Sequence, residues 1–408
     1  MEVTNTKTST SKEHLISSLF VSAIRKNAAI AVWRKPSAPK IEIIIDDDQN
    51  GGEENLKDLD ELPPGFMAQP FQTSAVHSPI YIKAGSYHAI HLDDNNRNED
   101  QRNIIPEFEH TDTKILATDL VEITYNHGDI SNTPSKTNTY STPKEAFLNT
   151  VEKAIATIKS GELYKVVPAK IKCIDLPDNF DLASVFLSLC EAYPNAFINC
   201  FYSEKTGLYI GASPETLIKT KGDEFFTMAL AGTQKAKGEN PLKHVAWTQK
   251  EIEEQALVSR YIVDCFKKIR LREYKEIGPK TTIAGGLLHL KSEFLVDMKA
   301  TNFPQLGSVM LELLHPTSAI CGMPKNQALD FLQSEESFDR AYFSGFIGPV
   351  NMDEETTLYV NLRCAKLANK KTWLYAGAGI TEDSVPEKEW EETELKCNII
   401  GQFIQTVK

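Results

Sequence analysis

Two segments of the chain place a pair of glutamates, three residues apart, on the apolar side of a predicted helix. In residues 387–407, at about 100° per residue, Glu389, Glu392 and Lys396 fall on the same side as Ile399. That side is the one that a helix normally buries. Buried carboxylates have to be neutralised, and either a nearby lysine or a metal ion would do so.

Residues 247–270 repeat this pattern. Glu251 and Glu254 continue an apolar stripe that includes Val258 and Ile262. Two helices that each direct a Glu-x-x-Glu pair inward could form one oxygen-rich cation site. The alternative is that these glutamates lie in first helical turns, where the helix dipole favours negative charge. Acidic first turns are common, so the pattern alone leaves both readings open.

Composition and charge exclude several classes of protein. The chain has 408 residues, of which 41% are hydrophobic, enough for a substantial core. The net charge is −12 and no long basic run is present, so we expect no nucleic-acid partner. Apolar stretches such as residues 41–45 are far shorter than the roughly 18 residues of a membrane helix. The start of the chain does not resemble a signal peptide, and the cysteines are scattered singly, so we expect a cytoplasmic protein without disulfides or membrane contact.

The order of predicted helices and strands indicates a mixed α+β fold with mainly antiparallel sheets packed face to face and flanked by helices. Residues 142–145 have the pattern of a capping box, with proline at the first helical position, for a helix that ends near Gly161. We expect residues 1–140 to be a variable part of the same fold as residues 141–408. The predicted strands in the second part are 165–174, 196–202, 207–212, 225–231, 343–350, 357–365 and 372–376.

Isolated charges and a glycine-rich loop mark candidate site residues within these strands. Lys165 and Arg363 are single charges in strand-forming runs, and Glu215 follows a strand in a Ser-Pro turn. The loop from Gly377 to Gly379 fails the dinucleotide-binding pattern because Glu382 stands where its last glycine would be. Its backbone N–H groups could still bind a carboxylate.

Taken together and in order, these segments resemble one known family. The resemblance rests on Lys165-Val-Val-Pro-Ala-Lys, Gly211-Ala-Ser-Pro-Glu215, Ala231-Gly-Thr-Gln, Leu287-Leu-His289-Leu-Lys-Ser292, His315-Pro-Thr-Ser-Ala-Ile-Cys-Gly322, Phe338-Asp-Arg-Ala-Tyr-Phe-Ser-Gly, Leu362-Arg363-Cys-Ala, Ala376-Gly-Ala-Gly-Ile and Glu389-Trp-Glu-Glu392-Thr-Glu-Leu-Lys396. The chain from about residue 143 to 405 resembles the chorismate-utilising enzymes, which share the fold of anthranilate synthase component I, and within them the isochorismate synthases.

The resemblance implies a Mg²⁺-dependent enzyme that acts on chorismate, a dicarboxylate. By position in the family motifs, the resemblance implies that Lys165 is the general base, that Glu215 is the general acid and that His289 lies beside the leaving hydroxyl. The residues implied to bind the substrate carboxylates are Gly232, Thr233, Arg363, Gly377, Gly379 and Lys396. Glu254 and Glu392 are implied to bind Mg²⁺ directly, and Glu251 and Glu389 are implied to bind its water ligands. Carboxylates suit Mg²⁺, a hard cation that prefers oxygen ligands and retains water.

The implied reaction is addition of water at ring carbon 2 with loss of the hydroxyl at carbon 4, for either menaquinone or siderophore biosynthesis. It needs a base and an acid on opposite faces of the ring. Lys165 favours water over ammonia as nucleophile, so we expect no glutaminase subunit, and we expect a monomer. Ala231 stands at the position where aminodeoxychorismate synthases typically have a nucleophilic lysine, so we do not expect that activity. Salicylate synthases, which go on to eliminate pyruvate, share the lysine and remain the alternative.

Three residues depart from the family pattern. Gln255 stands where relatives often have histidine, and Ser292 stands where threonine is usual. Phe343 replaces a tyrosine that many relatives have, so a hydrogen bond from this position to the enolpyruvyl carboxylate is not expected.

Overall fold

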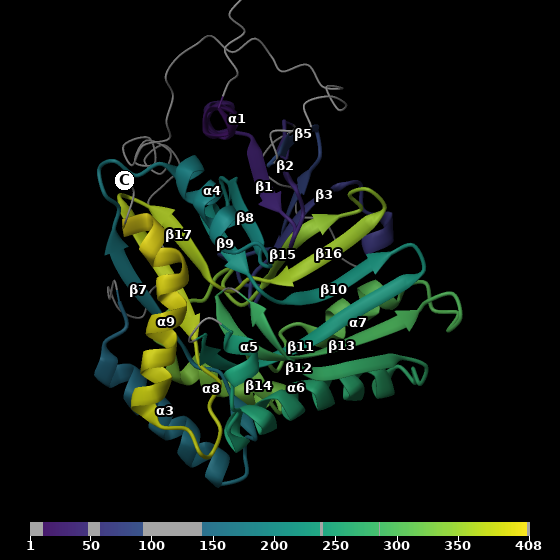
Figure 1. Ribbon diagram of the computed structural model, residues 1–408, viewed down its shortest axis with the longest axis vertical. Coiled ribbons are helices and arrows are strands. Elements are labelled where there is room, and N and C mark those ends of the chain that lie inside the picture. The colour runs from purple at the N-terminus through teal and green to yellow at the C-terminus, as the bar shows by residue number, and fades with distance from the viewer. Residues whose placement is uncertain (1–10, 48–57, 93–140, 237–239, 285, 406–408) are drawn as a thin grey trace, which may run out of the picture.

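The computed structural model describes residues 11–47, 58–92, 141–236, 240–284 and 286–405. Two eight-stranded sheets pack face to face, and helices lie on their outer surfaces (Figure 1). The strand pairs in these ranges are antiparallel. The predicted α+β fold with antiparallel sheets is therefore confirmed.

The first sheet joins strands from both parts of the sequence. In spatial order its strands are β5 (Ser86–His91), β2 (Lys40–Asp46), β1 (Ala29–Arg34), β8 (Phe197–Ser203), β9 (Gly207–Ser213), β17 (Cys364–Ala368), β18 (Lys371–Gly377) and β7 (Ala169–Asp175). Its outer face is covered by α1 (Lys12–Arg25), α4 (Leu182–Ala192) and α9 (Pro386–Gln405). Helix α9 runs along β7 and β18, so its inward side chains reach the end of this sheet (Figure 1).

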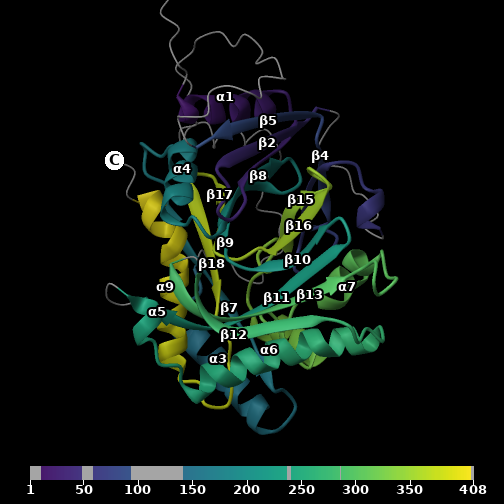
Figure 2. The ribbon, with the colours of Figure 1, turned by 45° about the vertical axis from the view of Figure 1, so that its right-hand side comes forward.

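The second sheet is also built from both parts of the sequence. In spatial order its strands are β12 (Lys275–Ala284), β13 (Leu287–Asp297), β11 (Glu224–Lys235), β10 (Thr216–Lys221), β16 (Glu355–Val360), β15 (Phe346–Val350), β3 (Gly65–Gln69) and β4 (Ile80–Lys83). Helices α6 (Gln249–Lys268) and α7 (Leu306–Leu314) cover its outer face, and α6 lies along β11 and β13 (Figure 2).

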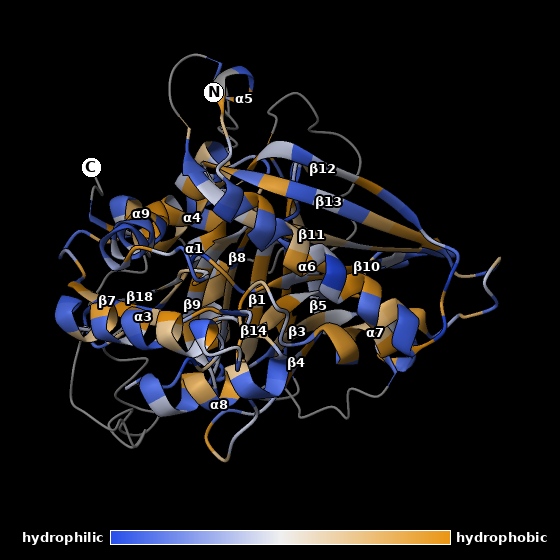
Figure 3. Cartoon of the chain, turned by 90° about the horizontal axis from the view of Figure 1, so that it is seen from below, coloured by the Kyte–Doolittle hydropathy of each residue, from blue (hydrophilic) through white to orange (hydrophobic). Residues whose placement is uncertain are grey.

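The remaining elements are short or lie at one end of the sheets. They are η1 (Leu59–Glu61), α3 (Lys144–Lys159), β6 (Lys165–Val166), α5 (Pro241–His244), β14 (Gly322–Met323) and α8 (Lys325–Glu335). Helices on this side of the molecule carry hydrophobic and hydrophilic stretches in alternation, as amphipathic helices do (Figure 3). None of the helices in the described ranges has the length and apolar composition needed to cross a membrane.

Aromatic side chains fill the space between the two sheets. The rings of Trp33 in the first sheet and Phe66 in the second have centroids 5.6 Å apart. Phe197 and Tyr359 stack across the same interface with centroids 4.0 Å apart. Contacts of this kind fix the spacing and the relative rotation of the sheets, because offset and tilted ring pairs have preferred geometries.

Two strand predictions and one cap prediction were wrong in instructive ways. The predicted strand 357–365 is two strands in different sheets, β16 and β17, because the chain crosses from one sheet to the other at residues 361–363. The predicted strand 165–174 is divided at Pro168, which lacks a backbone N–H. The capping box at 142–145 is absent: Pro143 is the N-cap and makes no side-chain hydrogen bond, while Thr142 Oγ1 accepts from Ile171 N at 3.1 Å.

A buried ion pair fixes the segments that carry the site. Arg340 donates to Glu336 through Nε at 2.8 Å and through Nη2 at 2.5 Å, and both side chains are almost fully buried. The same guanidinium donates to the carbonyl oxygens of Ile320 and Val167, at 2.9 and 2.6 Å. Glu336 in turn accepts from Ala169 N at 2.8 Å. The pair therefore ties the chain on both sides of Pro168 to the loop before β14.

Replacing Arg340 by Met should lower the free energy of unfolding by about 3–5 kcal/mol, because it leaves the Glu336 carboxylate buried without its partner. Urea denaturation followed by circular dichroism measures this loss. The matched control is Lys153→Met, which removes the 2.7 Å ion pair to the neighbouring residue Glu335. That pair is solvent-exposed, so its loss should cost less than about 1 kcal/mol. Equal losses for the two variants would contradict the role given to Arg340.

Candidate active site

The site lies where the chain crosses twice between the sheets. Glu215 stands between β9 and β10, on the crossing from the first sheet to the second, and Arg363 stands between β16 and β17, on the crossing back. The crossings run side by side: Ala212 N donates to Arg363 O at 2.9 Å, and Val360 N donates to Glu215 O at 3.0 Å. Arg363 has a φ of 47°, the left-handed conformation that a sharp change of direction requires.

Most of the predicted site residues line one cavity at these crossings. Those that line it are Glu215, Gly232, Thr233, Glu254, His289, Arg363, Gly377, Gly379 and Lys396. Arg340 and Phe343 line it as well. The cavity walls thus come from both sheets and from α6 and α9, which lie far apart in the sequence.

Glu215 and Arg363 are buried ionisable groups that face this cavity. Burial raises the pKa of Glu215 to about 8, although Lys165 and Arg363 act in the opposite direction. Burial lowers the pKa of Arg363 to about 10, against the opposing effects of Glu392 and Glu215. At neutral pH the site therefore contains a protonated carboxyl group beside a charged guanidinium. Arg363 Nε is buried and has no hydrogen-bond partner in the described part of the protein.

Lys165 is fully buried in β6, which pairs with β14. Its Nζ lies 3.0 Å from Oε1 of Glu254 on α6. Gly379 makes this approach possible, because a Cβ at that position would lie 2.2 Å from Glu254 Oε1 and 3.1 Å from Lys165 Cε. The absence of a side chain at Gly379, in the loop after β18, therefore leaves room for the contact between Lys165 and Glu254.

His289 is held in one tautomer by a bulge in the neighbouring strand. The register of β11 against β13 shifts between Ala231 and Gln234, and Gly232 there has a φ of 65°. Gly232 O lies 2.7 Å from His289 Nδ1, so Nδ1 carries the proton and Nε2 is left as an acceptor. Burial first, and then the charge of Arg363, lower the pKa of His289 to about 3. The ring is thus neutral, and its buried Nε2 has no protein partner among the described residues.

The four predicted metal-site glutamates do not share one environment. Glu251 stabilises the start of α6: its Oε2 accepts from Thr248 N at 2.6 Å, and its Oε1 accepts from Gln234 Nε2 at 3.0 Å. For Glu251 the structure matches the alternative interpretation, a first-turn carboxylate. The other three pair with different lysines: Glu254 with Lys165, Glu389 with Lys250, and Glu392 with Lys396 at 2.6 Å.

The lysines set the charge of these carboxylates. Burial would raise the pKa of Glu254, but the charges of Lys165, Lys250 and Lys396 outweigh it and the pKa is lowered. The pKa of Glu389 is raised by burial and by Glu392, against the effect of Lys250.

The chemistry of this donor set fits a divalent cation. Three carboxylates from two helices act on the same lysine, Lys250, and hard oxygen ligands are those that Mg²⁺ prefers. Within the described ranges, however, no group of three or more His, Cys, Asp or Glu side chains is arranged to hold a metal ion. Each of these three carboxylates is paired with a lysine, so each would have to give up that contact before it could bind a metal ion.

Two residues with clear roles in this arrangement were missed from the sequence. Lys250 precedes Glu254 by one helical turn, and this i,i+4 spacing is the signal that could have identified it. Arg340 lies in a family-like block, but nothing in the sequence shows which carbonyl groups it reaches.

Two of the residues that depart from the family pattern contact each other: Gln255 Nε2 donates to Ser292 Oγ at 3.2 Å.

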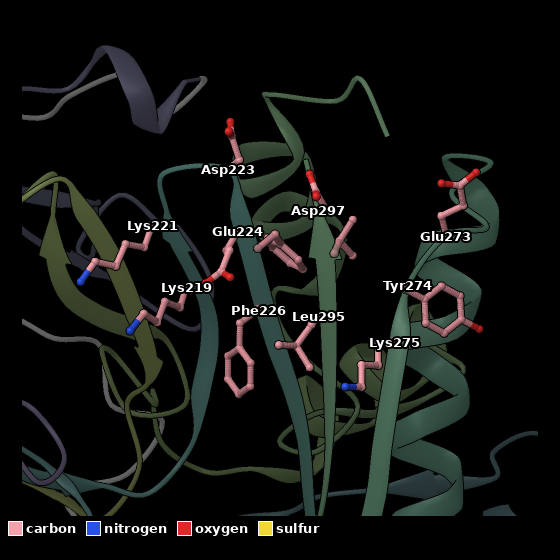
Figure 4. Close-up of a pocket in the computed structure, with 12 residues that line it drawn as sticks. Lys219, Lys221, Asp223, Glu224, Phe226, Glu273, Tyr274, Lys275, Leu295 and Asp297 are labelled. Atoms are coloured by element: carbon pink, nitrogen blue, oxygen red, sulfur yellow. The ribbon is translucent and has the colours of Figure 1, made fainter. Parts of the chain in front are cut away.

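A second, wider hollow lies on the second sheet, across the ends of β10 to β13 (Figure 4). Lysines such as Lys219 and Lys275 and acids such as Asp223 and Asp297 point from it in different directions (Figure 4). A binding site for a charged small molecule needs polar groups that converge. The crossing site, with its buried and convergent groups, is therefore the candidate.

Comparison with known proteins gives the family. Residues 68–405 match the family model described as chorismate binding enzyme. The chain is 30% identical over 244 residues to the vibriobactin-specific isochorismate synthase of Vibrio cholerae, with 58% of this chain and 61% of that relative covered. It is 28% identical over 257 residues to the isochorismate synthase EntC of Escherichia coli, with 62% and 65% covered. The alignments thus span less than two thirds of either relative.

The fold is also similar to a solved structure. The menaquinone-specific isochorismate synthase MenF of Escherichia coli superimposes with a TM-score of 0.67 at 20% identity, over 92% of this chain and 89% of that one. At this identity the likeness concerns the fold, while the match to the family model extends over most of the sequence. The chain belongs to the chorismate binding enzymes.

Proposed function

We propose that the protein is an isochorismate synthase, which converts chorismate to isochorismate by adding water at ring carbon 2 and releasing the hydroxyl at carbon 4. The observation that carries the proposal is that Glu215, which is buried and protonated at neutral pH, lines one cavity with Arg363 and Glu254, and that the buried Lys165 lies 3.0 Å from Glu254. The relatives named above are isochorismate synthases, which supports the proposal.

Glu215 is the general acid in this proposal. A departing hydroxide has to gain a proton, and a carboxyl group with a pKa of about 8 still holds one at neutral pH. His289 lies beside the leaving hydroxyl, where its unprotonated Nε2 can accept a hydrogen bond. The ring stays neutral, so it orients the hydroxyl and leaves protonation to Glu215.

Lys165 is the general base that takes a proton from the attacking water. Its Nζ lies 3.0 Å from Glu254. An ammonium group has no lone pair, so Lys165 has to give up a proton before it can accept one from the attacking water. The substrate carboxylates are bound by Arg363, Gly377, Gly379, Gly232, Thr233 and Lys396, all of which line the cavity. The free Nε of Arg363 suits a carboxylate, which accepts charge-assisted hydrogen bonds.

Glu254 and Glu392 would hold Mg²⁺ directly, and Glu251 and Glu389 would hold its water ligands. A bound Mg²⁺ would orient the ring carboxylate and offset its negative charge. Both carboxylate oxygens of Glu251 already accept hydrogen bonds, one from Thr248 N at the start of α6 and one from Gln234 Nε2. We also infer that residues 1–140 complete the same fold as residues 141–408, and that the protein works without a glutaminase subunit, as a cytoplasmic monomer.

Activity should fall as pH rises through about 8, because the acid form of Glu215 is present below its pKa and is lost above it. Turnover measured between pH 6.5 and 9.5 should show this alkaline decline. Glu215→Gln should lower turnover about a hundredfold or more, and Lys165→Ala should do the same, while chorismate still binds.

The matched control for Glu215→Gln is Glu224→Gln, which makes the same chemical change at an exposed position on β11. It should leave turnover and its pH dependence unchanged. A wild-type rate that stays flat from pH 7 to 9.5, or near-normal turnover of Glu215→Gln, would remove Glu215 from the role of acid.

Removal of a metal ligand should abolish turnover without unfolding the protein. Glu254→Gln and Glu392→Gln keep the side-chain volume but remove the charge that a divalent cation needs, so activity should not be rescued by excess Mg²⁺. Steady-state kinetics with and without a chelator, together with thermal melts, test this. Full activity of the wild-type protein in excess chelator would contradict the metal assignment.

The product should be isochorismate with its enolpyruvyl group retained. Separation of products by liquid chromatography should show isochorismate, and a lactate-dehydrogenase-coupled assay at pH 7.5 should detect little pyruvate. Stoichiometric pyruvate would make the protein a salicylate synthase. An aminated product that depends on ammonia would contradict the assignment of water as nucleophile.

A further inference from the structure

Lys250 lies in the first turn of α6, and its ammonium group contacts the carboxylate of Glu389 in the first turn of α9. Glu389 is only 2% exposed. A cation at a helix N-terminus is opposed by the helix dipole, so Lys250 needs compensation from elsewhere. The contact therefore joins the first turns of two helices, and the acidic partners stabilise the charge of Lys250.

The same three carboxylates that pair with lysines also act on Lys250. Glu389, Glu392 and Glu254 all favour its charged form, and together they outweigh the cost of its burial and raise its pKa. Glu254 and Glu392 are the proposed metal ligands, and Glu389 is a proposed holder of metal-bound water. The ammonium group thus stands in the field that would attract a divalent cation.

Of the three lysines paired with these carboxylates, Lys250 is the most exposed to solvent. Its side chain is 23% exposed, whereas that of Lys165 is 0% exposed and that of Lys396 is 10% exposed. Lys396 is further held by a 2.7 Å hydrogen bond to Gly377 O. Three carboxylates and three lysines balance in charge, so an entering divalent cation leaves the cluster with two excess positive charges, and withdrawal of one lysine lowers that excess to one.

We propose that Lys250 is a tethered cation that occupies the charge position of Mg²⁺ in the metal-free protein and has to withdraw for the metal to bind. This inference rests on the metal site of the proposed function. Lys250 keeps the three carboxylates from repelling one another while the site is empty, and it weakens the affinity for Mg²⁺ by competing for Glu389. Binding of Mg²⁺ is then coupled to release of the contact between α6 and α9.

The test is titration of the full chain with Mg²⁺ alone, by isothermal calorimetry and by thermal melts, without chorismate. Lys250→Gln keeps a hydrogen-bond donor for Glu389 but removes the charge, so it should bind Mg²⁺ at least about tenfold more tightly than the wild type. Its metal-free melting temperature should be lower, and Mg²⁺ should raise that temperature more than it does in the wild type.

Two further variants make the outcome decisive. Lys388→Gln removes an exposed charge next to Glu389 in the sequence and should leave the affinity for Mg²⁺ close to that of the wild type, as should Lys250→Arg, which retains the tethered charge. If Lys250→Gln only melts earlier and binds Mg²⁺ no more tightly, Lys250 is a structural link and the inference is wrong. If neither the wild type nor any variant binds Mg²⁺, the metal site of the proposed function is wrong as well.

Discussion

Two neighbouring chain crossings between the sheets are the constraint on which the rest of the site depends. At each crossing the backbone leaves one sheet for the other, and hydrogen bonds between Ala212 and Arg363 and between Glu215 and Val360 keep the two crossings together. Because both crossings lie between the packed sheets, the side chains that they carry are directed into the interior. This is why one acid and one guanidinium end in the same cavity although almost 150 residues separate them in the sequence.

The site contains several buried ionisable side chains, and burying a charged group costs free energy unless the group is paired. Glu215 avoids this cost by keeping its proton, and His289 avoids it by staying neutral. Glu254, Glu389 and Glu392 are paired with lysines instead. These three ion pairs are therefore balanced in charge, whereas Arg363 remains charged at neutral pH and its Nε has no partner among the described residues.

Helical periodicity was the part of the sequence that predicted the structure best. The wheels placed Glu389 and Lys396 on the buried side of α9 because that helix is long and its apolar residues keep a regular spacing. They left open whether Glu251 would contribute to a cation site or stabilise the start of its own helix, and the structure shows the second, because Glu251 Oε2 accepts from Thr248 N.

The strand prediction across residues 357–365 failed for a related reason. Each half of that segment has strand-forming residues, but the left-handed turn at Arg363 depends on the neighbouring crossing and leaves no local signal. Lys250 was overlooked although it stands one helical turn before Glu254, and its contact with Glu389, 139 residues away, could not be predicted from local spacing. The roles drawn from the family resemblance remain predictions, although most of the residues that carry them line one cavity.

The most direct measurement is a crystal structure of the protein with Mg²⁺ and isochorismate. The account predicts that the ring lies between Lys165 and Glu215, that Arg363 holds the enolpyruvyl carboxylate, and that Glu254 and Glu392 coordinate the metal. Electron density for the ligand in the hollow across β10 to β13, with the crossing site unchanged, would contradict it.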